Sequence, residues 1–109
     1  MKLISRVYTI SIAADDDAAQ TVTIADIYNP ALIQELKIIV PDTTNGVTFT
    51  FAILDPDAFS RYSIASLIDD TSHILQPNRV IGNGYKLSML MSGVTGNAIT
   101  ITIKVSCWE

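Results

Sequence analysis

Apolar and polar residues alternate one by one over several stretches of the chain, and this period of two predicts β-strands. The clearest stretch is Ile99–Trp108, where isoleucine, valine and cysteine occupy every second position. Residues 85–91 alternate in a similar way, and residues 92–97 between the two stretches contain two glycines and an asparagine. Since a short hairpin loop needs such residues, the pattern predicts a C-terminal β-hairpin with one apolar face.

Further strands are expected upstream, each bounded by turn residues such as Gly, Pro, Asn and Asp. In segment 32–40 we expect Leu36, Ile38 and Val40 to point inward, and the Asn45-Gly46 turn after it to form a second hairpin with segment 47–54. The strands predicted before residue 85 are 3–12, 20–24 paired with 3–12, 32–40, 47–54 and 71–75, while 63–68 fits a strand or a loop.

At most one short helix is expected, near residues 55–62. Asp55 can cap it, Pro56 suits a first helical position, and Asp57 favours the positive end of the helix dipole. With about seven strands and at most this one helix, the chain is expected to be all-β. The fold class predicted for residues 1–109 is a single-domain antiparallel β-sandwich, either jelly-roll or immunoglobulin-like.

A second set of apolar side chains is expected on the strand faces that point away from the core. Isolated exposed apolar residues are ordinary, but this many on short strands predicts a second buried surface, formed by association. The candidate interface residues are Leu3, Val7, Ile33, Ile39, Leu54, Leu90 and Trp108.

Composition points the same way. Hydrophobic residues make up 49% of the chain and charged residues only 17%, with a mean hydropathy of +0.35. A small domain has much surface for its volume, so part of this apolar material is expected to be covered by another subunit. The net charge of −4 and seven scattered Lys and Arg residues argue against nucleic acid or an anionic membrane as the partner.

All nine Asp residues fall outside the predicted strands, so acidic ends of the sandwich are expected. No apolar run is long enough to span a bilayer, and no signal peptide is expected, because polar residues interrupt the first apolar run with strand periodicity.

The residues that usually carry chemistry are sparse. His73 is the one histidine and Cys107 the one cysteine, and neither has a nucleophile elbow or a glycine-rich oxyanion loop nearby in the sequence. Carboxylate pairs at 55/57 and 69/70 allow a calcium site but lack the EF-hand spacing. We therefore expect no enzyme activity, no metal and no cofactor. Carbohydrate binding remains an alternative, with exposed aromatics as candidates: Tyr28, Phe59, Tyr62 and Trp108.

The succession of short strands, the P-D-T-T-N-G loop at 41–46 and the closing G-N-G-Y-K-L-S-M-L-M-S-G-V-T-G-N-A-I-T-I-T-I-K-V at 82–105 resemble small β-sandwich virion proteins of tailed bacteriophages. The resemblance is one of style over most of the chain, and it transfers no functional residue. It implies a structural protein, such as a head-decoration or minor capsid component, that binds itself and a capsid lattice. It also implies a location in the virion, and in the host cytoplasm during assembly.

Overall fold

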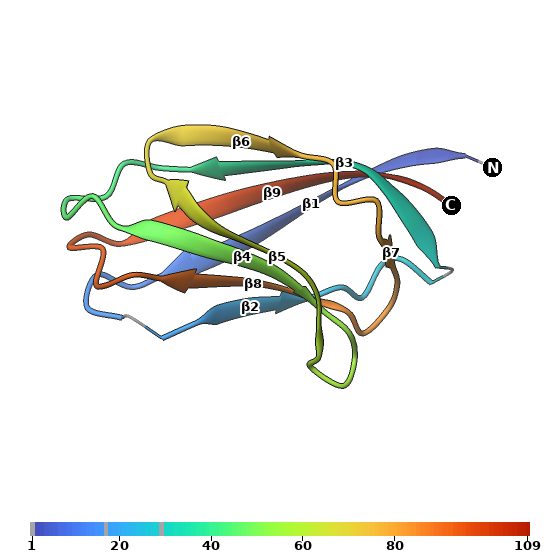
Figure 1. The fold of residues 1–109 in the computed structure, drawn as a ribbon, viewed down its shortest axis with the longest axis horizontal. Helices are drawn as coiled ribbons and strands as arrows, with labels where there is room; N and C mark the ends of the chain where they lie inside the picture. Colours follow the sequence, from blue (N-terminus) through green and yellow to red (C-terminus); the bar gives the residue numbers. More distant parts are fainter. Residues whose placement is uncertain (1, 17, 29) are drawn as a thin grey trace.

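The computed structural model describes residues 2–16, 18–28 and 30–109, and in this part of the chain it contains β-strands and no helix (Figure 1). The strands form two antiparallel sheets packed face to face, which confirms the predicted all-β sandwich. Their bounds are β1 Leu3–Ile12, β2 Gln20–Thr23, β3 Ala31–Val40, β4 Thr48–Leu54, β5 Ser60–Ile68, β6 Thr71–Leu75, β7 Val80–Ile81, β8 Lys86–Met91 and β9 Ile99–Trp108. None of the described residues belongs to a helix long and apolar enough to cross a membrane.

The strand order is that of a jelly roll. Sheet A has the order β1-β9-β3-β6, with the two-residue β7 also paired to β3, and sheet B has the order β2-β8-β4-β5. With β7 set aside, the first strand pairs with the last, the second with the last but one, the third with the sixth and the fourth with the fifth. This nested pairing is what results when one long hairpin is wrapped into two sheets, and it selects the jelly roll over the immunoglobulin-like alternative.

Two predicted hairpins and one predicted pairing are wrong. The strands β8 and β9 lie in different sheets, as do β3 and β4, and β2 pairs with β8 instead of β1. The Gly-containing turns at 92–97 and 41–46 carry the chain from one layer to the other. Alternation shows which face of a strand is buried but not which strand lies beside it. A tight turn that connects the two sheets therefore has the same sequence pattern as a hairpin turn within one sheet.

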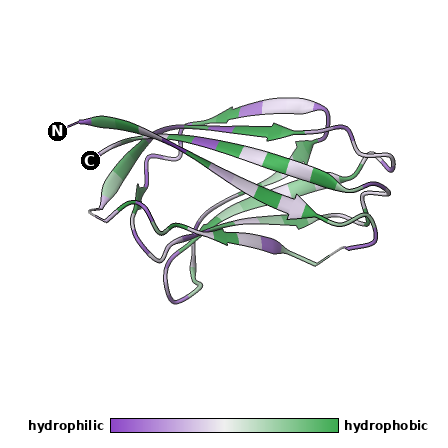
Figure 2. Ribbon diagram, turned by 180° about the vertical axis from the view of Figure 1, so that it is seen from behind, coloured by the Kyte–Doolittle hydropathy of each residue, from purple (hydrophilic) through white to green (hydrophobic). Residues whose placement is uncertain are grey.

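The core fills the space between the two sheets with the inward residues of each strand. The last strand supplies five of them, from Ile99 to Cys107 at every second position, as its alternation predicted. Phe49, Phe51 and Ile53 of β4 face them from sheet B with at most 1% of their surface exposed. In Figure 2 the long strands of sheet A show this alternation as green and pale bands.

A β-bulge in β3 corrects one predicted interface residue. Opposite β9, Ile33 pairs with Cys107 and Glu35 with Ser106, which leaves Gln34 as an extra residue. One extra residue moves the side chain of each preceding residue of the strand to the opposite face of the sheet. Leu36, Ile38 and Val40 point inward as predicted, but Ile33 is buried in the core with 2% exposure, and Leu32 takes the outward place.

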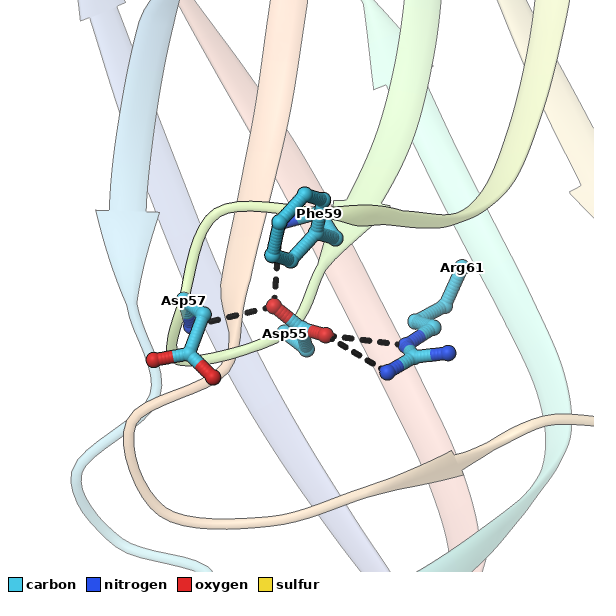
Figure 3. Close-up of polar contacts among 4 residues, drawn as sticks. All are labelled: Asp55, Asp57, Phe59 and Arg61. Carbon is cyan, nitrogen blue, oxygen red and sulfur yellow. Dashed lines mark hydrogen bonds and ion pairs between the residues drawn. The ribbon is translucent and has the colours of Figure 1, made fainter.

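The predicted short helix near residues 55–62 is a tight turn followed by β5 (Figure 3). Asp55 does accept the backbone N–H of Asp57, at 3.0 Å, as a cap would. Ala58 then adopts a left-handed conformation, with φ of 68°, and the backbone amide of Phe59 also donates to Asp55, at 2.9 Å. The chain therefore reverses direction after one turn, and β5 begins at Ser60.

Candidate interaction surface

The seven predicted interface residues do not form one surface. Leu3, Val7, Ile39 and Trp108 lie on strands of sheet A with their side chains on its outer face, whereas Leu54 and Leu90 lie on the outer face of sheet B. Ile33 is in the core. The four sheet A members therefore share one face of the sandwich, and the two sheet B members share the opposite face.

An apolar row crosses the end of sheet A near the chain termini. Trp108 of β9 lies between Leu3 of β1 and Leu32 of β3, and Leu32 in turn pairs with Val80 of β7. Directly opposed residues point to the same side of a sheet, so these four side chains line up on the outer face. Leu3, Leu32 and Val80 are 43%, 39% and 48% exposed. We call Leu3, Trp108, Leu32 and Val80 the terminal row.

Half of the terminal row was missed from the sequence. Strict alternation from Leu36 places Leu32 in the core and Ile33 outside, and the extra residue Gln34 exchanges the two. Val80 lies in a strand of only two residues, too short to show any alternation. The signal that could have revealed it is the apolar pair Val80-Ile81 inside an otherwise polar loop.

A shallow hollow of about 380 Å³ adjoins the terminal row. Its walls combine the apolar edge of Leu32 and Trp108 with three side-chain amides, those of Gln34, Gln76 and Asn78. Amide groups both donate and accept hydrogen bonds, and none of these three carries a charge. The hollow is therefore apolar on one side and polar but uncharged on the other, a combination that suits contact with another protein.

A second row runs across the middle of the same face. Val7 of β1 lies opposite Lys104 of β9, which lies opposite Lys37 of β3, which lies opposite Ile74 of β6. The two outer members are the most exposed aliphatic residues of the face, at 60% for Val7 and 62% for Ile74. The two lysines face each other directly, an arrangement that is mildly destabilising in a sheet.

The two ends of the sandwich differ in charge. The loop segments 13–16, 18–19, 41–47, 69–70 and 92–98 meet at the end far from the chain termini, shown on the left of Figure 1, and contain no Lys or Arg. The Asp residues described in them are Asp15, Asp16, Asp42, Asp69 and Asp70. At the opposite end, two of the Asp residues form ion pairs, Asp26 with Arg6 at 3.3 Å and Asp55 with Arg61 at 2.8 Å. We call the end far from the chain termini the acidic end.

Hydrogen bonds hold the loops of the acidic end together. The Asp69 carboxylate accepts the backbone N–H and the hydroxyl of Thr43, at 2.8 and 2.7 Å, and the hydroxyl hydrogen bond is the main reason that the pKa of Asp69 lies below its usual range. Asn97 accepts from the amide of Thr44 and donates to the carbonyl of Asp42. The Asp69 carboxylate therefore belongs to a fixed loop framework.

The candidate chemical groups are not gathered into a reactive site. His73 contacts the carbonyl of Ile68 at 2.8 Å, and Cys107 is buried in β9, where burial raises the pKa of its thiol. The amide of Phe59, then Arg61, lower the pKa of Asp55 below its usual range, because both donate to the ionised carboxylate. No three His, Cys, Asp or Glu side chains among the described residues could jointly hold a metal ion.

The aromatic candidates for sugar binding divide by environment. The ring of Tyr62 packs at a tilt against Phe51 in the core, with 6.5 Å between ring centroids. Tyr28 and Phe59 are 78% and 68% exposed, on the β2–β3 and β4–β5 connections, and Trp108 belongs to the terminal row. Phe59 is held by the Asp55-centred turn of Figure 3.

Several known structures have a similar backbone at low sequence identity. The core of Drosophila NLP, a protein studied for pentamer formation and histone binding, gives a TM-score of 0.43 at 12% identity, covering 94% of this chain and 98% of its own. The VP2 subviral particle of infectious bursal disease virus gives a TM-score of 0.33 at 17% identity, covering 95% of this chain and 33% of VP2. A mutant VP2 protein of the same virus, in T=1 particles, gives a TM-score of 0.33 at 20% identity, covering 95% of this chain and 32% of VP2.

The chain thus spans about a third of the length of the VP2 chains that it resembles. No protein-family model matches the sequence, and no curated protein matches it. The similar structures include viral capsid proteins and a histone-binding protein. At these TM-scores the likeness supports no inference about function, which has to come from the chain's own residues.

Proposed function

We propose that this chain is a non-enzymatic structural protein that acts by associating with itself and by docking onto a larger protein assembly. The observation that carries the proposal is the terminal row, four outward apolar side chains on four neighbouring strands of one sheet. Burying the exposed part of each aliphatic member is worth about 1 kcal/mol, since burial of a whole leucine or valine side chain is worth about 1.5–3 kcal/mol. A surface of this kind favours contact with another protein over exposure to water.

The finer part of the proposal is that the assembly is a tailed-phage virion, in which this chain is a capsid-decoration or minor structural component. It is supported by the resemblance of the sequence to small virion proteins and by the surplus of apolar residues in a chain of 109 residues. On this proposal residues 1–109 act as one β-sandwich domain. Genes for a terminase or a portal protein beside this gene would support the assignment, and a neighbourhood of cellular metabolic genes would contradict it.

The single tryptophan makes the surface directly measurable. Trp108 is the one tryptophan of the chain and lies inside the terminal row, between Leu3 and Leu32. If the row is buried by association, dilution from tens of micromolar should shift the Trp108 emission to the red and increase its quenching by acrylamide. The sedimentation coefficient should fall over the same concentration range.

The matched variants are Leu32→Ser in the row and Leu90→Ser on the outer face of sheet B. Leu32 and Leu90 are 39% and 47% exposed, so the two changes remove similar apolar surface. Association should weaken several-fold in Leu32→Ser and stay unchanged in Leu90→Ser. A wild-type protein that sediments as a monomer at all concentrations, with Trp108 emission independent of dilution, would contradict self-association.

Carbohydrate binding is the second candidate, favoured by two strongly exposed aromatic rings at the end of the sandwich opposite the acidic end. A glycan-array signal lost on Phe59→Ala or Trp108→Ala would support it. A blank array with protein that is folded would leave the structural role as the better account.

A further inference from the structure

Strand β1 differs from the other edges of the two sheets in the described chain. The edge strands β2 and β6 have four and five residues, and β5 is interrupted by two register shifts in its pairing with β4. Short and bulged edges are the usual means by which proteins prevent unwanted strand pairing. In contrast, β1 pairs with β9 over ten residues without a register shift and carries no proline. Among the described strands, none hydrogen-bonds to its other side, although β2 of sheet B comes close to β1.

The register of β1 identifies the backbone groups that remain open. Lys2 and Glu109 exchange both backbone hydrogen bonds, at 3.0 and 2.9 Å. In an antiparallel pair such positions alternate with positions whose N–H and C=O point away from the partner strand. The even-numbered residues of β1 therefore bond to β9. The odd-numbered ones direct their N–H and C=O to the open side: Leu3, Ser5, Val7, Thr9 and Ser11.

We propose that β1 pairs antiparallel with β1 of a second copy of this chain, about a two-fold axis at Val7, so that two copies of sheet A become one continuous sheet. This rests on the self-association part of the proposed function and adds a second contact between copies, beside the terminal row, with its own register. Centring the pair on Val7 places Ser5 opposite Thr9 and Leu3 opposite Ser11 of the other copy. All five open residues then exchange hydrogen bonds, about ten in total, as many as a typical protein–protein interface contains.

The side chains suit this register. Val7 is 60% exposed and would meet Val7 of the second copy, while the hydroxyls of Ser5 and Thr9 would face each other. On the inner side, Arg6 would come opposite Tyr8 of the second copy, whose hydroxyl donates to Asp26 at 2.6 Å. Arg6 is already paired with Asp26 of its own chain, so each carboxylate would lie near two guanidinium groups. The one charged residue of β1 thus finds an opposite charge in the dimer.

Charge along the strand axis also favours the antiparallel arrangement. The acidic end lies where β1 finishes, beyond Ile12, and the ion-paired Arg6 and Asp26 lie towards its start. A parallel pair would place two acidic ends side by side, where their carboxylates repel each other. The antiparallel pair places them at opposite ends of the joined sheet, several Debye lengths apart at physiological salt.

The first test compares Val7→Lys with Ile74→Lys by sedimentation equilibrium at tens of micromolar. The two residues have nearly equal exposure and lie in the same cross-strand row, at opposite edges of sheet A. Wild type and Ile74→Lys should have at least twice the monomer mass of 11.9 kDa, and Val7→Lys should have half the wild-type mass or less. Circular dichroism and melting temperature check that both variants fold.

A charge swap tests the register itself. Val7→Lys and Val7→Glu should each lose the β1 pairing when alone, because residue 7 lies opposite residue 7 of the second copy, and should regain it when the two variants are mixed. Val7→Cys should form a disulfide-linked dimer on mild oxidation, since directly opposed strand residues lie within disulfide reach, while Ile74→Cys should not. The cysteine pair also decides the question if the lysine variant fails to fold.

The outcomes separate this inference from the function on which it rests. A wild-type protein that associates while Val7→Lys associates equally well, or a Val7→Cys protein that does not crosslink, overturns the β1 pairing and leaves self-association through the terminal row standing. Association of the lysine and glutamate variants that is no stronger mixed than alone overturns the Val7-centred register. A strictly monomeric wild type overturns both self-association and the pairing.

Discussion

Two isoleucines of β3 give the sharpest test of the fold. Ile33 and Ile39 are six residues apart, so strict alternation would place both side chains on the same face of the sheet. The bulge at Gln34 separates them: Ile33 is 2% exposed in the core, whereas Ile39 is half-buried on the outer face of sheet A. The pair of substitutions Ile33→Ala and Ile39→Ala therefore compares the same chemical change in two environments.

The expected magnitudes differ several-fold. Removing the side chain of a fully buried isoleucine costs about 2–5 kcal/mol, because the lost burial is joined by the cost of a cavity. On the outer face no closed cavity forms at Ile39, and we expect a loss of about 1 kcal/mol or less. With a urea dependence of about 1–3 kcal/mol per molar, a loss of 3 kcal/mol at Ile33 lowers the unfolding midpoint by about 1–3 M.

Urea unfolding followed by far-ultraviolet circular dichroism measures both variants. All samples need the same protein concentration, because association adds to apparent stability. Equal midpoints for Ile33→Ala and Ile39→Ala, or a larger loss for Ile39→Ala, would show that β3 has no bulge at Gln34. The terminal row would then lose Leu32.

Other positions give smaller tests. Lys104 opposes Lys37, so Lys104→Glu should raise the unfolding free energy by about 0.5 kcal/mol, seen as a higher urea midpoint that salt reduces. The amide of Phe59 and the guanidinium of Arg61 lower the pKa of Asp55. The ionised carboxylate therefore stabilises the fold fully above its unfolded pKa near 3.8, and this stabilisation is lost as pH falls through the folded pKa. The melting temperatures of Asp55→Asn and wild type should differ at pH 7 and converge in acid. Gly96→Ala should destabilise more than Gly46→Ala: both have positive φ, at a cost of about 1–2 kcal/mol, but only at Gly96 would a Cβ come within 3.0 Å of neighbouring side chains.

The sequence predicted the positions of the strands far better than it predicted which strands pair with each other. Leu3–Ile12, Thr71–Leu75 and Ile99–Trp108 have the predicted bounds, because alternation records burial and burial is what a sandwich imposes on each strand. Pairing depends on contacts between distant segments, which alternation does not encode. The hairpin expected between the last two strands is a connection between sheets for this reason.

The candidate surface was predicted in part. Leu3, Val7 and Trp108 are outward on sheet A as expected, since β1 and β9 are regular along their whole length. The missing members depend on irregular features, namely one extra residue in β3 and a two-residue strand. Their role in association remains a prediction for all of these residues.

The mutual hydrogen bonds of Lys2 and Glu109 have a practical consequence for work with this protein. They bring residues near both chain ends together beside Leu3 and Trp108, at the right of Figure 1. An affinity tag or fluorescent protein fused at either end would start next to these side chains and could shield them. A circular permutant that joins residue 109 to residue 2 and opens in a loop of the acidic end would carry its fusion partner some 43 Å away, along the longest dimension of the molecule.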